Sequence, residues 1–240
     1  MFVNEVADLF RDYCDEPDTT FLTNANVATY LKLGYGQFRE VVINANPQFY
    51  AISQDISLSN ANSYDFATAA VKIMGARANL TAPRVHKIVT LYKIDGSGNI
   101  VWFIKPVGNL EQLYQNISDN NRYCLVDIKL HFAYNTSGDY RLWYVPVDDY
   151  SALAPALGAG SGVDWTGGLA ATTTEIDELY QFHDLIALYA YEQYAIRDGG
   201  ISAHLQAHKK KRIKELEDYV VEGKNLGANQ VVHVQSETWY

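Results

Sequence analysis

The segment QFHDLIALYAYEQYAIRDGG, residues 181–200, limits more than any other how this chain can fold. Between Leu179 and Ile196 its only formal charges are those of Asp184 and Glu192. A surface helix ordinarily has an apolar stripe and a charged opposite face. This helix lacks the charged face and therefore needs cover on two sides. Helices of its own chain can supply one side, and either the same chain or a neighbouring copy can supply the other.

Three tyrosines lie close together in this segment, at Tyr189, Tyr191 and Tyr194. The whole chain contains 18 tyrosines and four tryptophans. These amphipathic side chains suit interfaces that are part apolar and part wet. We therefore name the three tyrosines as candidate residues of a subunit interface.

Helical periodicity recurs at both ends of the chain. A short helix is expected over residues 3–14, ended by Pro17, and a longer one from Thr23 or Asn24 to Asn46-Pro47. Residues 110–117 predict a short helix. The charge-poor helix is expected to be capped by Thr173 or Thr174 and to end at Gly199-Gly200. A last helix is expected from a cap at Ser202 to about Val221. Gly34 weakens its helix by about 1 kcal/mol relative to alanine, which indicates close packing by another backbone.

The middle of the chain alternates apolar and polar residues, as strands do. Residues 86–94 and 99–107 flank Asp95-Gly-Ser-Gly98, and residues 124–134 and 140–147 flank the second turn at 135–139. Each pair predicts an antiparallel β-hairpin.

The expected fold class is α+β, because runs of helix flank a run of strands. The expected architecture is a bundle of two N-terminal and two C-terminal helices with an inserted antiparallel β-hairpin region. Its boundaries define a single domain, 1–222, followed by a C-terminal tail, 223–240. Within the domain, the sequence places the bundle at 1–50 and 173–222, the β insertion at 84–148 and a glycine-rich loop, anchored by Trp165, at 154–172.

The charge balance and cysteine content exclude several classes of protein. A net charge of −9 argues against a protein dedicated to gripping nucleic acid. No apolar run approaches a membrane span, and the N-terminus has no signal-peptide pattern. Two isolated cysteines favour a reducing compartment. The one basic run, Lys209, Lys210, Lys211 and Arg212, predicts either a solvated helix face with a Lys211–Glu215 pair or contact with an acidic partner.

No motif with a catalytic or cofactor-binding mechanism is present in the sequence. Phosphate-loop, dinucleotide, nucleophile-elbow and HExxH patterns are all missing. His204 and His208 are four residues apart but lack a third ligand nearby, so we expect exposed polar histidines. The neighbours His183 and Asp184 point in different directions on a helix and suit a hydrolase poorly. The expectation is a protein without enzymatic activity, cofactor or metal.

Several segments, in this order, resemble the head–tail connector adaptor proteins of tailed bacteriophages. They are DTTFLTNANVATYLKLGYGQFRE, then RVHKIVTLYKIDGSGNIVWFIKPVGNLEQLY, YRLWYVPVDD and ELYQFHDLIALYAYEQYAIRDGG, and a last helix starting near Ala203. The resemblance spans roughly residues 4–222, and its sharpest part is Phe182-His183-Asp184-Leu185. The glycine-rich loop and the tail depart from the family pattern, so a related stopper or tail-terminator role stays open.

The resemblance implies a structural subunit of the virion neck, assembled in the host cytoplasm. Copies of the chain, typically twelve, would form a ring that docks below the portal protein, continues the DNA channel and carries the next neck or tail protein. The genome would be passing cargo, and acidic residues would suit the channel wall. The portal face would be Lys209–Arg212 or Val231–Tyr240.

Two further expectations concern exposed aromatic residues. An alternative function, a carbohydrate- or receptor-binding module, requires Trp102, Trp143 and Trp165 to line one groove. Residues 229–240 are expected to become ordered against a neighbouring subunit, by strand addition or by burial of Trp239 and Tyr240.

Overall fold

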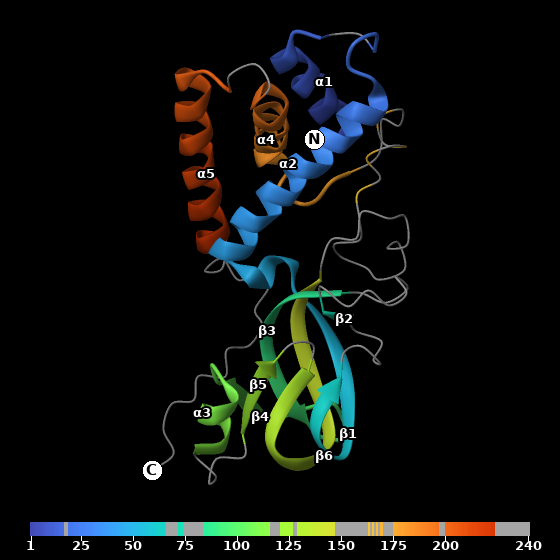
Figure 1. Ribbon diagram of the computed structural model, residues 1–240, viewed down its shortest axis with the longest axis vertical. Helices are drawn as coiled ribbons and strands as arrows, with labels where there is room; N and C mark the ends of the chain where they lie inside the picture. Colours follow the sequence, from blue (N-terminus) through green and yellow to red (C-terminus); the bar gives the residue numbers. More distant parts are fainter. Residues whose placement is uncertain are drawn as a thin grey trace. The chain divides into compact units, whose positions relative to one another are not determined.

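The protein is described here by a computed structural model that divides into two compact units (Figure 1). The helix unit comprises Met1–Phe49 and Val163–Tyr240, and the β unit comprises Tyr50–Gly162. The structure describes residues 1–16, 19–65, 72–73, 84–115, 121–126, 129–146, 163, 165, 167, 169, 175–196 and 200–223.

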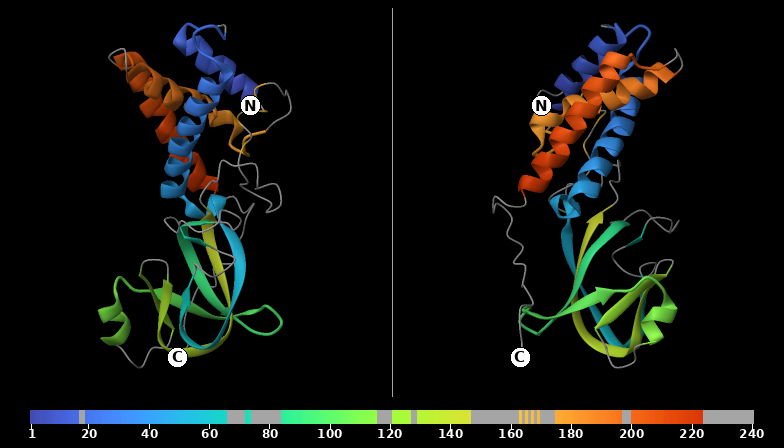
Figure 2. Two further views of the ribbon diagram at one scale, coloured as in Figure 1. Left: turned by 45° about the vertical axis from the view of Figure 1, so that its right-hand side comes forward. Right: turned by 90° about the vertical axis from the view of Figure 1, so that its left-hand side faces the viewer.

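Four α-helices form the described framework of the helix unit. They are α1 (Val3–Cys14), α2 (Asn24–Ala45), α4 (Asp184–Ala195) and α5 (Ala203–Gly223). The 3-10 turns η1 (Pro47–Tyr50) and η2 (Tyr180–Phe182) follow α2 and precede α4. Helix α4 packs against α1, α2 and α5, an arrangement that can be followed in Figure 2. The charge-poor helix is therefore in contact with all three other helices of its unit, as α2 also is.

The helix boundaries follow from local hydrogen bonds that the sequence predicts. The hydroxyl of Thr23 accepts the N–H of Asn26 at 3.3 Å and caps α2. The hydroxyl of Ser202 accepts the N–H of Leu205 at 3.3 Å at the start of α5. Each hydroxyl thus satisfies one of the amide groups that a helix start leaves without an intrahelical partner.

The start expected for the charge-poor helix is wrong. Thr173 and Thr174 lie outside the described residues, and α4 begins only at Asp184. Glu175 instead forms an isolated β-bridge with Phe2. The carboxylate of Asp177 accepts the N–H of Leu179 at 2.9 Å, which holds a turn in place of a helical start.

The β unit contains six described strands and one helix. The strands are β1 (Ile52–Asp65), β2 (Lys72–Ile73), β3 (Arg84–Ile94), β4 (Ile100–Pro106), β5 (Arg122–Val126) and β6 (Lys129–Pro146), and the helix is α3 (Leu110–Gln115). Strands β3, β4, β5 and β6 close into a small barrel, because β6 pairs with both β5 and β3. Strand β1 adds to β6, and β2 adds to β3.

The expected architecture, a bundle of two N-terminal and two C-terminal helices with a β-hairpin region, is wrong. The described residues form five α-helices, one of them within the β unit, and a closed four-stranded barrel extended by two strands. The β2–β3 and β4–β5 pairs are parallel, which a series of hairpins cannot produce. The helices and strands remain segregated along the chain, as in α+β proteins.

The second expected hairpin is also wrong, because residues 135–139 do not reverse the chain. Strand β6 continues through them, and β1 pairs antiparallel with it on both sides of this stretch. Gly138, at φ +120°, pairs with Leu58 next to a shift in register. Such irregularities bend and twist a strand without ending it. The first hairpin is confirmed: β3 and β4 pair antiparallel, and Gly98 donates its N–H to the carbonyl of Asp95 at 2.9 Å.

The barrel interior consists of apolar and aromatic side chains. The fully buried members include Leu91, Leu130 and Leu142. Strand β1, which the sequence analysis does not predict, contributes Ile56 and Leu58 to this core. Its other residues are mostly polar, since much of β1 lies at the surface as an added strand, and this weakens the apolar alternation that reveals a strand.

Candidate functional site

Helices of its own chain cover the first half of α4, where Leu185–Ala190 are buried, whereas Tyr191–Tyr194 are half-buried. Adding a Cβ atom to Gly34 of α2 would place it 2.4 Å from the carbonyl oxygen of Ile186 and 2.9 Å from the amide of Ala190. Real Cβ atoms are essentially never found so close, so the two helix backbones touch at this point. The expectation of close packing at Gly34 is confirmed.

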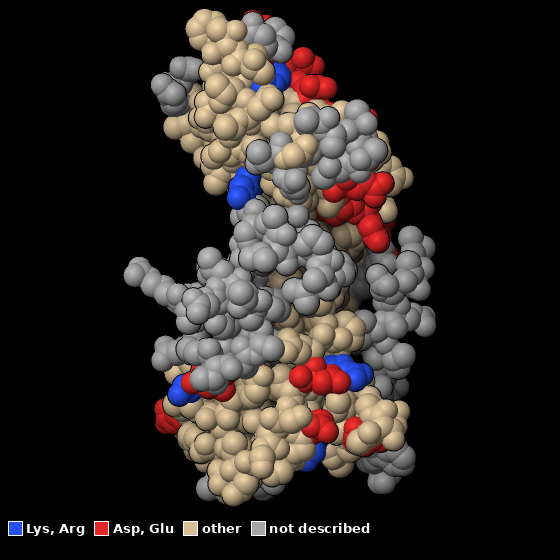
Figure 3. Space-filling view, turned by 90° about the vertical axis from the view of Figure 1, so that its right-hand side faces the viewer, with Lys and Arg blue, Asp and Glu red and all other residues tan. Residues whose placement is uncertain are grey.

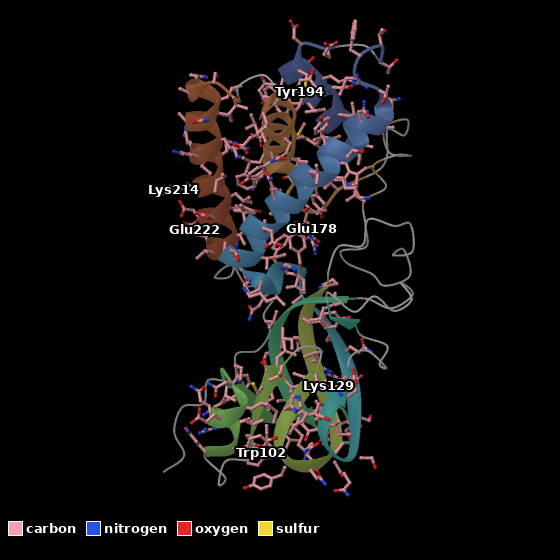
Figure 4. All side chains as sticks on the ribbon, viewed as in Figure 1. Trp102, Lys129, Glu178, Tyr194, Lys214 and Glu222 are labelled. Carbon is pink, nitrogen blue, oxygen red and sulfur yellow. The ribbon has the colours of Figure 1, made fainter. Side chains whose placement is uncertain are left out.

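The three candidate interface tyrosines all contact other helices of the same unit. The ring of Tyr194 packs edge-on against Phe10 and Tyr30, with centroid distances of 6.2 and 5.7 Å, and Figure 4 places it among these helices. The ring of Tyr191 lies 5.9 Å from that of Tyr13. Tyr189 is buried, with 7% of its surface exposed. These contacts make the tyrosines part of the fold of one copy.

Tyr189 also has an electrostatic environment that keeps its phenol neutral. Burial raises the pKa of Tyr189 to about 12, with smaller contributions from the negative charges of Glu192 and Glu217. The ammonium group of Lys209 lies over its ring, 3.9 Å from the centroid, and donates to the carboxylate of Glu192 at 2.5 Å. A cation held between a ring face and a carboxylate joins α4 to α5.

The basic run of α5 divides into inward and outward residues. Arg212 donates twice to the carboxylate of Asp184, at 2.8 and 2.7 Å, and once to Glu215 at 2.7 Å. These hydrogen bonds raise the pKa of the Arg212 guanidinium, the one to Asp184 most. Lys210 and Lys211 are exposed, and Lys211 forms the expected pair with Glu215 at 3.7 Å. Only these two lysines of the run are available to a partner.

The segment Phe182–Leu185, the sharpest part of the phage resemblance, joins several elements of the helix unit. The guanidinium of Arg212 lies 5.0 Å from the ring of Phe182, whose other neighbour is Tyr219 at 5.4 Å. Leu185 is fully buried. Asp184 binds Arg212 on α5, so each of these side chains holds helices together.

His183 is fully buried and contacts two acceptors that are distant from each other in the sequence. Its Nε2 lies 2.7 Å from the carboxylate of Asp177, and its Nδ1 lies 3.2 Å from the carbonyl oxygen of Met1. A carbonyl and an ionised carboxylate both accept hydrogen bonds, so each ring nitrogen of His183 lies within hydrogen-bond distance of an acceptor. The contacts connect the start of the chain to the segment before α4.

These contacts bear on whether His183 and Asp184 could act together as the acid–base pair of a hydrolase. The histidine pairs with Asp177, and Asp184 pairs with Arg212, so the two neighbours have different partners. A general base must reach its substrate within hydrogen-bond distance, and the ring of His183 is enclosed. Sequence reasoning missed Asp177 as the partner; it is one of three acids, with Glu175 and Glu178, shortly before the helix, and nothing in the sequence distinguishes it from the other two.

The other residues considered for chemistry are distributed as follows. His204 and His208 are exposed, as expected. Among the described residues, no group of three or more histidine, cysteine, aspartate or glutamate side chains could hold a metal ion. The ring of Trp165 is buried 5.5 Å from that of Tyr35, so it cannot line a groove with the exposed Trp102. Trp239 and Tyr240 lie outside the described residues.

On the face drawn in Figure 3, the described part of the chain shows acidic patches and isolated basic side chains, with no extended basic surface. No helix in the described part of the chain combines the length and the apolar character that crossing a membrane requires.

The strongest surface feature is one that sequence reasoning missed as a site, namely the first half of β4. Four consecutive large apolar residues are exposed there: Ile100, Val101, Trp102 and Phe103. The signal in the sequence was the uninterrupted run IVWFI, which lacks the polar alternation of a half-buried strand. Isolated exposed apolar residues are normal, whereas contiguous ones mark interaction sites.

Comparison with known proteins adds no family assignment. No protein-family model matches the chain, and no curated protein matches it.

Proposed function

We propose that the protein is a structural subunit of a phage head–tail connector, an adaptor that forms a ring below the portal protein. The proposal rests on the ordered resemblance of the sequence segments to that family. The observation that carries it is the state of the Phe182–Leu185 segment, in which the imidazole contacts Met1 and Asp177 and the carboxylate binds Arg212 of α5. A structural subunit needs such a segment, whereas an enzyme would present these groups to a substrate.

The division of α5 suggests which residues face the portal. Arg212 and Lys209 are held by carboxylates of their own chain, so they contribute to folding. Lys210 and Lys211 are exposed on the same helix. Exposed charges mainly steer association and set its salt dependence. In this proposal, α5 presents these two lysines to an acidic surface of the portal protein.

A reconstitution with purified portal protein tests the proposal. The full-length chain, mixed with portal rings, is expected to add a second ring seen by negative-stain electron microscopy. K210E/K211E is expected to weaken this binding more than tenfold at low salt and to leave folding intact. The matched control K214E changes a third exposed lysine of α5 and should have a smaller effect.

A genetic experiment decides whether this role is needed. Phage particles made without the protein are expected to contain filled heads without attached tails. Joined, infectious virions from the deletion would overturn the proposal. Binding to an isolated tail tube but not to portal would instead support the stopper or terminator role, and quenching of tryptophan fluorescence by sugars would support the carbohydrate-binding alternative.

A further inference from the structure

The first four residues of β4 are large and apolar, yet they are exposed to solvent. The exposed fractions are 47% for Ile100, 46% for Val101, 56% for Trp102 and 46% for Phe103, against 2% for the next residue, Ile104. No charged residue interrupts the run between Asn99 and Lys105. Trp102 lies at the outer edge of the β unit (Figure 4). Part of the strand therefore extends beyond the barrel core.

Among the described strands, this part of β4 is paired along one edge only, and the other is called its open edge below. Strand β3 pairs with it on one side, whereas β5 pairs on the other side only from Lys105 onwards. The amides of Lys105 and Val107 donate to the carbonyls of Asn121 and Tyr123, both at 2.8 Å, so they point towards β5. Backbone groups alternate in direction along a strand. The amide and carbonyl of Phe103 therefore point to the same side, where no described strand pairs with them.

An apolar strand with an unpaired edge is a template for the addition of another strand. Soluble proteins usually protect such an edge with a charge, a proline or a covering loop. Residues 100–103 include neither a charge nor a proline. An added strand would accept and donate main-chain hydrogen bonds at Phe103 and cover apolar surface on both faces.

The chain itself contains a segment with the chemistry of such a strand. Beyond Gly223, where α5 ends, the sequence continues for 17 residues (240 − 223) and includes Val231-Val232-His233-Val234. Three of these four residues are β-branched, a type that favours strands. Val231 is eight residues beyond Gly223 (231 − 223), a span of about 26–29 Å when the chain is extended. This span is the reach of the segment from the end of α5.

We propose that the open edge of β4 in one copy binds residues 231–234 of a second copy as an added strand. The contact joins two different surfaces of the same chain, so repeating it around a closing rotation produces a ring. The inference thus rests on the proposed ring and names the residues that join its subunits. The main-chain hydrogen bonds supply pairing, and the valines contact Trp102 and Phe103.

Proline substitutions in the full-length chain test the pairing, because proline removes the amide that an added strand needs. V232P and F103P are each expected to weaken self-association more than tenfold, measured by light scattering across a concentration series. V232A and F103L keep the amide and are expected to change it less than threefold. F103P removes an amide that points away from β3, so circular dichroism and thermal unfolding should show a folded protein.

Cross-linking between mixed copies identifies the partner. One full-length copy carries F103C, the other carries V232C, and a short bismaleimide joins them if the strand is exchanged. The native thiols interfere little, since burial raises the pKa of Cys14 to about 12 and also raises that of Cys124, while maleimides react with thiolates. The expected product is a covalent dimer. A copy with the cysteine at position 230, Q230C, should form it too, and Q230C/V232P should not.

Four results would overturn the inference. They are self-association of F103P equal to wild type, cross-links only within single chains that carry both cysteines, a monomeric wild-type protein at all concentrations, and intact rings on the portal formed by both proline variants. The last result would leave the proposed function standing. Strand exchange between copies that never bind portal would support the inference and contradict the proposed function.

Discussion

The two units differ in which side chains they bury and which they expose. All four buried polar or charged residues of the described chain, Arg11, Arg39, Asn46 and His183, lie in the helix unit. The described β unit buries no such residue, yet exposes four consecutive apolar side chains at the start of β4. Buried polar groups need specific partners and so fix one arrangement of helices. An exposed apolar edge leaves pairing capacity for another chain.

Arg11 illustrates how the helix unit uses its buried polar groups. Its guanidinium donates to the carbonyl of Leu22 and to the side chain of Asn24, both at 2.9 Å. These bonds fasten the connection between α1 and α2 at the position where α2 begins. The comparison teaches that the motif residues of the helix unit maintain its fold, and that binding to partners is better sought on exposed α5 lysines and on β4.

The largest expected effect comes from removing a buried polar group of the helix unit, the imidazole of His183. H183L removes one hydrogen-bond partner of the Asp177 carboxylate, whose side chain is 10% exposed and which keeps the N–H of Leu179 as a partner. The free energy of unfolding is expected to fall by about 2–4 kcal/mol. Urea unfolding measures the loss, and hydrogen exchange should show it in the helix unit, with β-unit protection retained.

The matched control is H208L, which changes an exposed histidine of the same unit. Its effect is expected to stay within about 0.5 kcal/mol. Equal losses in H183L and H208L would mean that the buried contacts of His183 to Asp177 and Met1 contribute nothing. The stability of the helix unit would then depend on its other contacts, among them its apolar packing and the Arg212–Asp184 ion pair.

Local features of this fold were predictable, because they depend on neighbours in the sequence. The Thr23 and Ser202 caps, the Asp95–Gly98 turn and the Lys211–Glu215 pair each involve residues at most four positions apart. Short-range propensity and side-chain spacing are sufficient to place such features.

The features that depend on distant residues were not predictable. Met1 and His183 meet across 182 positions, and Asp184 and Arg212 meet across 28. Strand β1 is mostly polar and is recognisable only through its pairing with β6. The run of apolar residues at β4 predicted a strand, but its exposure depends on where β5 begins to pair, which no local pattern specifies.

Gly34 in the helix unit and Gly96 in the β unit differ in how closely other backbone atoms approach them. G34A places a Cβ atom against the backbone of α4, whereas G96A in the β3–β4 turn meets nothing within 4 Å. G34A is expected to destabilise by about 1–3 kcal/mol and G96A to have little effect. Thermal and urea unfolding of the two variants check this.

The sign of the G34A effect separates packing from helix propensity. Alanine favours a helix interior over glycine by about 1 kcal/mol, so propensity alone predicts that G34A is more stable than wild type. A stabilised G34A would show that α2 and α4 can move apart at little cost. The close approach at Ile186 would then be no constraint on the helix unit.

The smallest expected effect concerns an arginine–aspartate ion pair, of which each unit contains an example. Asp184 and Asp55 each accept two hydrogen bonds from an arginine, Arg212 and Arg141, but their side chains are 22% and 52% exposed. D184N is expected to cost about 1–3 kcal/mol. D55N is expected to cost less than about 1 kcal/mol, because water screens the exposed pair. Urea unfolding at neutral pH measures both.

Acidification tests whether the Asp55 pair contributes at all. The hydrogen bond from Arg141 lowers the pKa of the Asp55 carboxyl below its ordinary value. A group with a lowered folded-state pKa stabilises the protein above its unfolded-state pKa, roughly 3.9 for aspartate, and loses that contribution as the pH falls through the folded-state value. The stability difference between wild type and D55N should therefore be constant above about pH 5 and vanish at lower pH. A difference that persisted in acid would assign the effect of D55N to the β1–β6 pairing itself and not to charge.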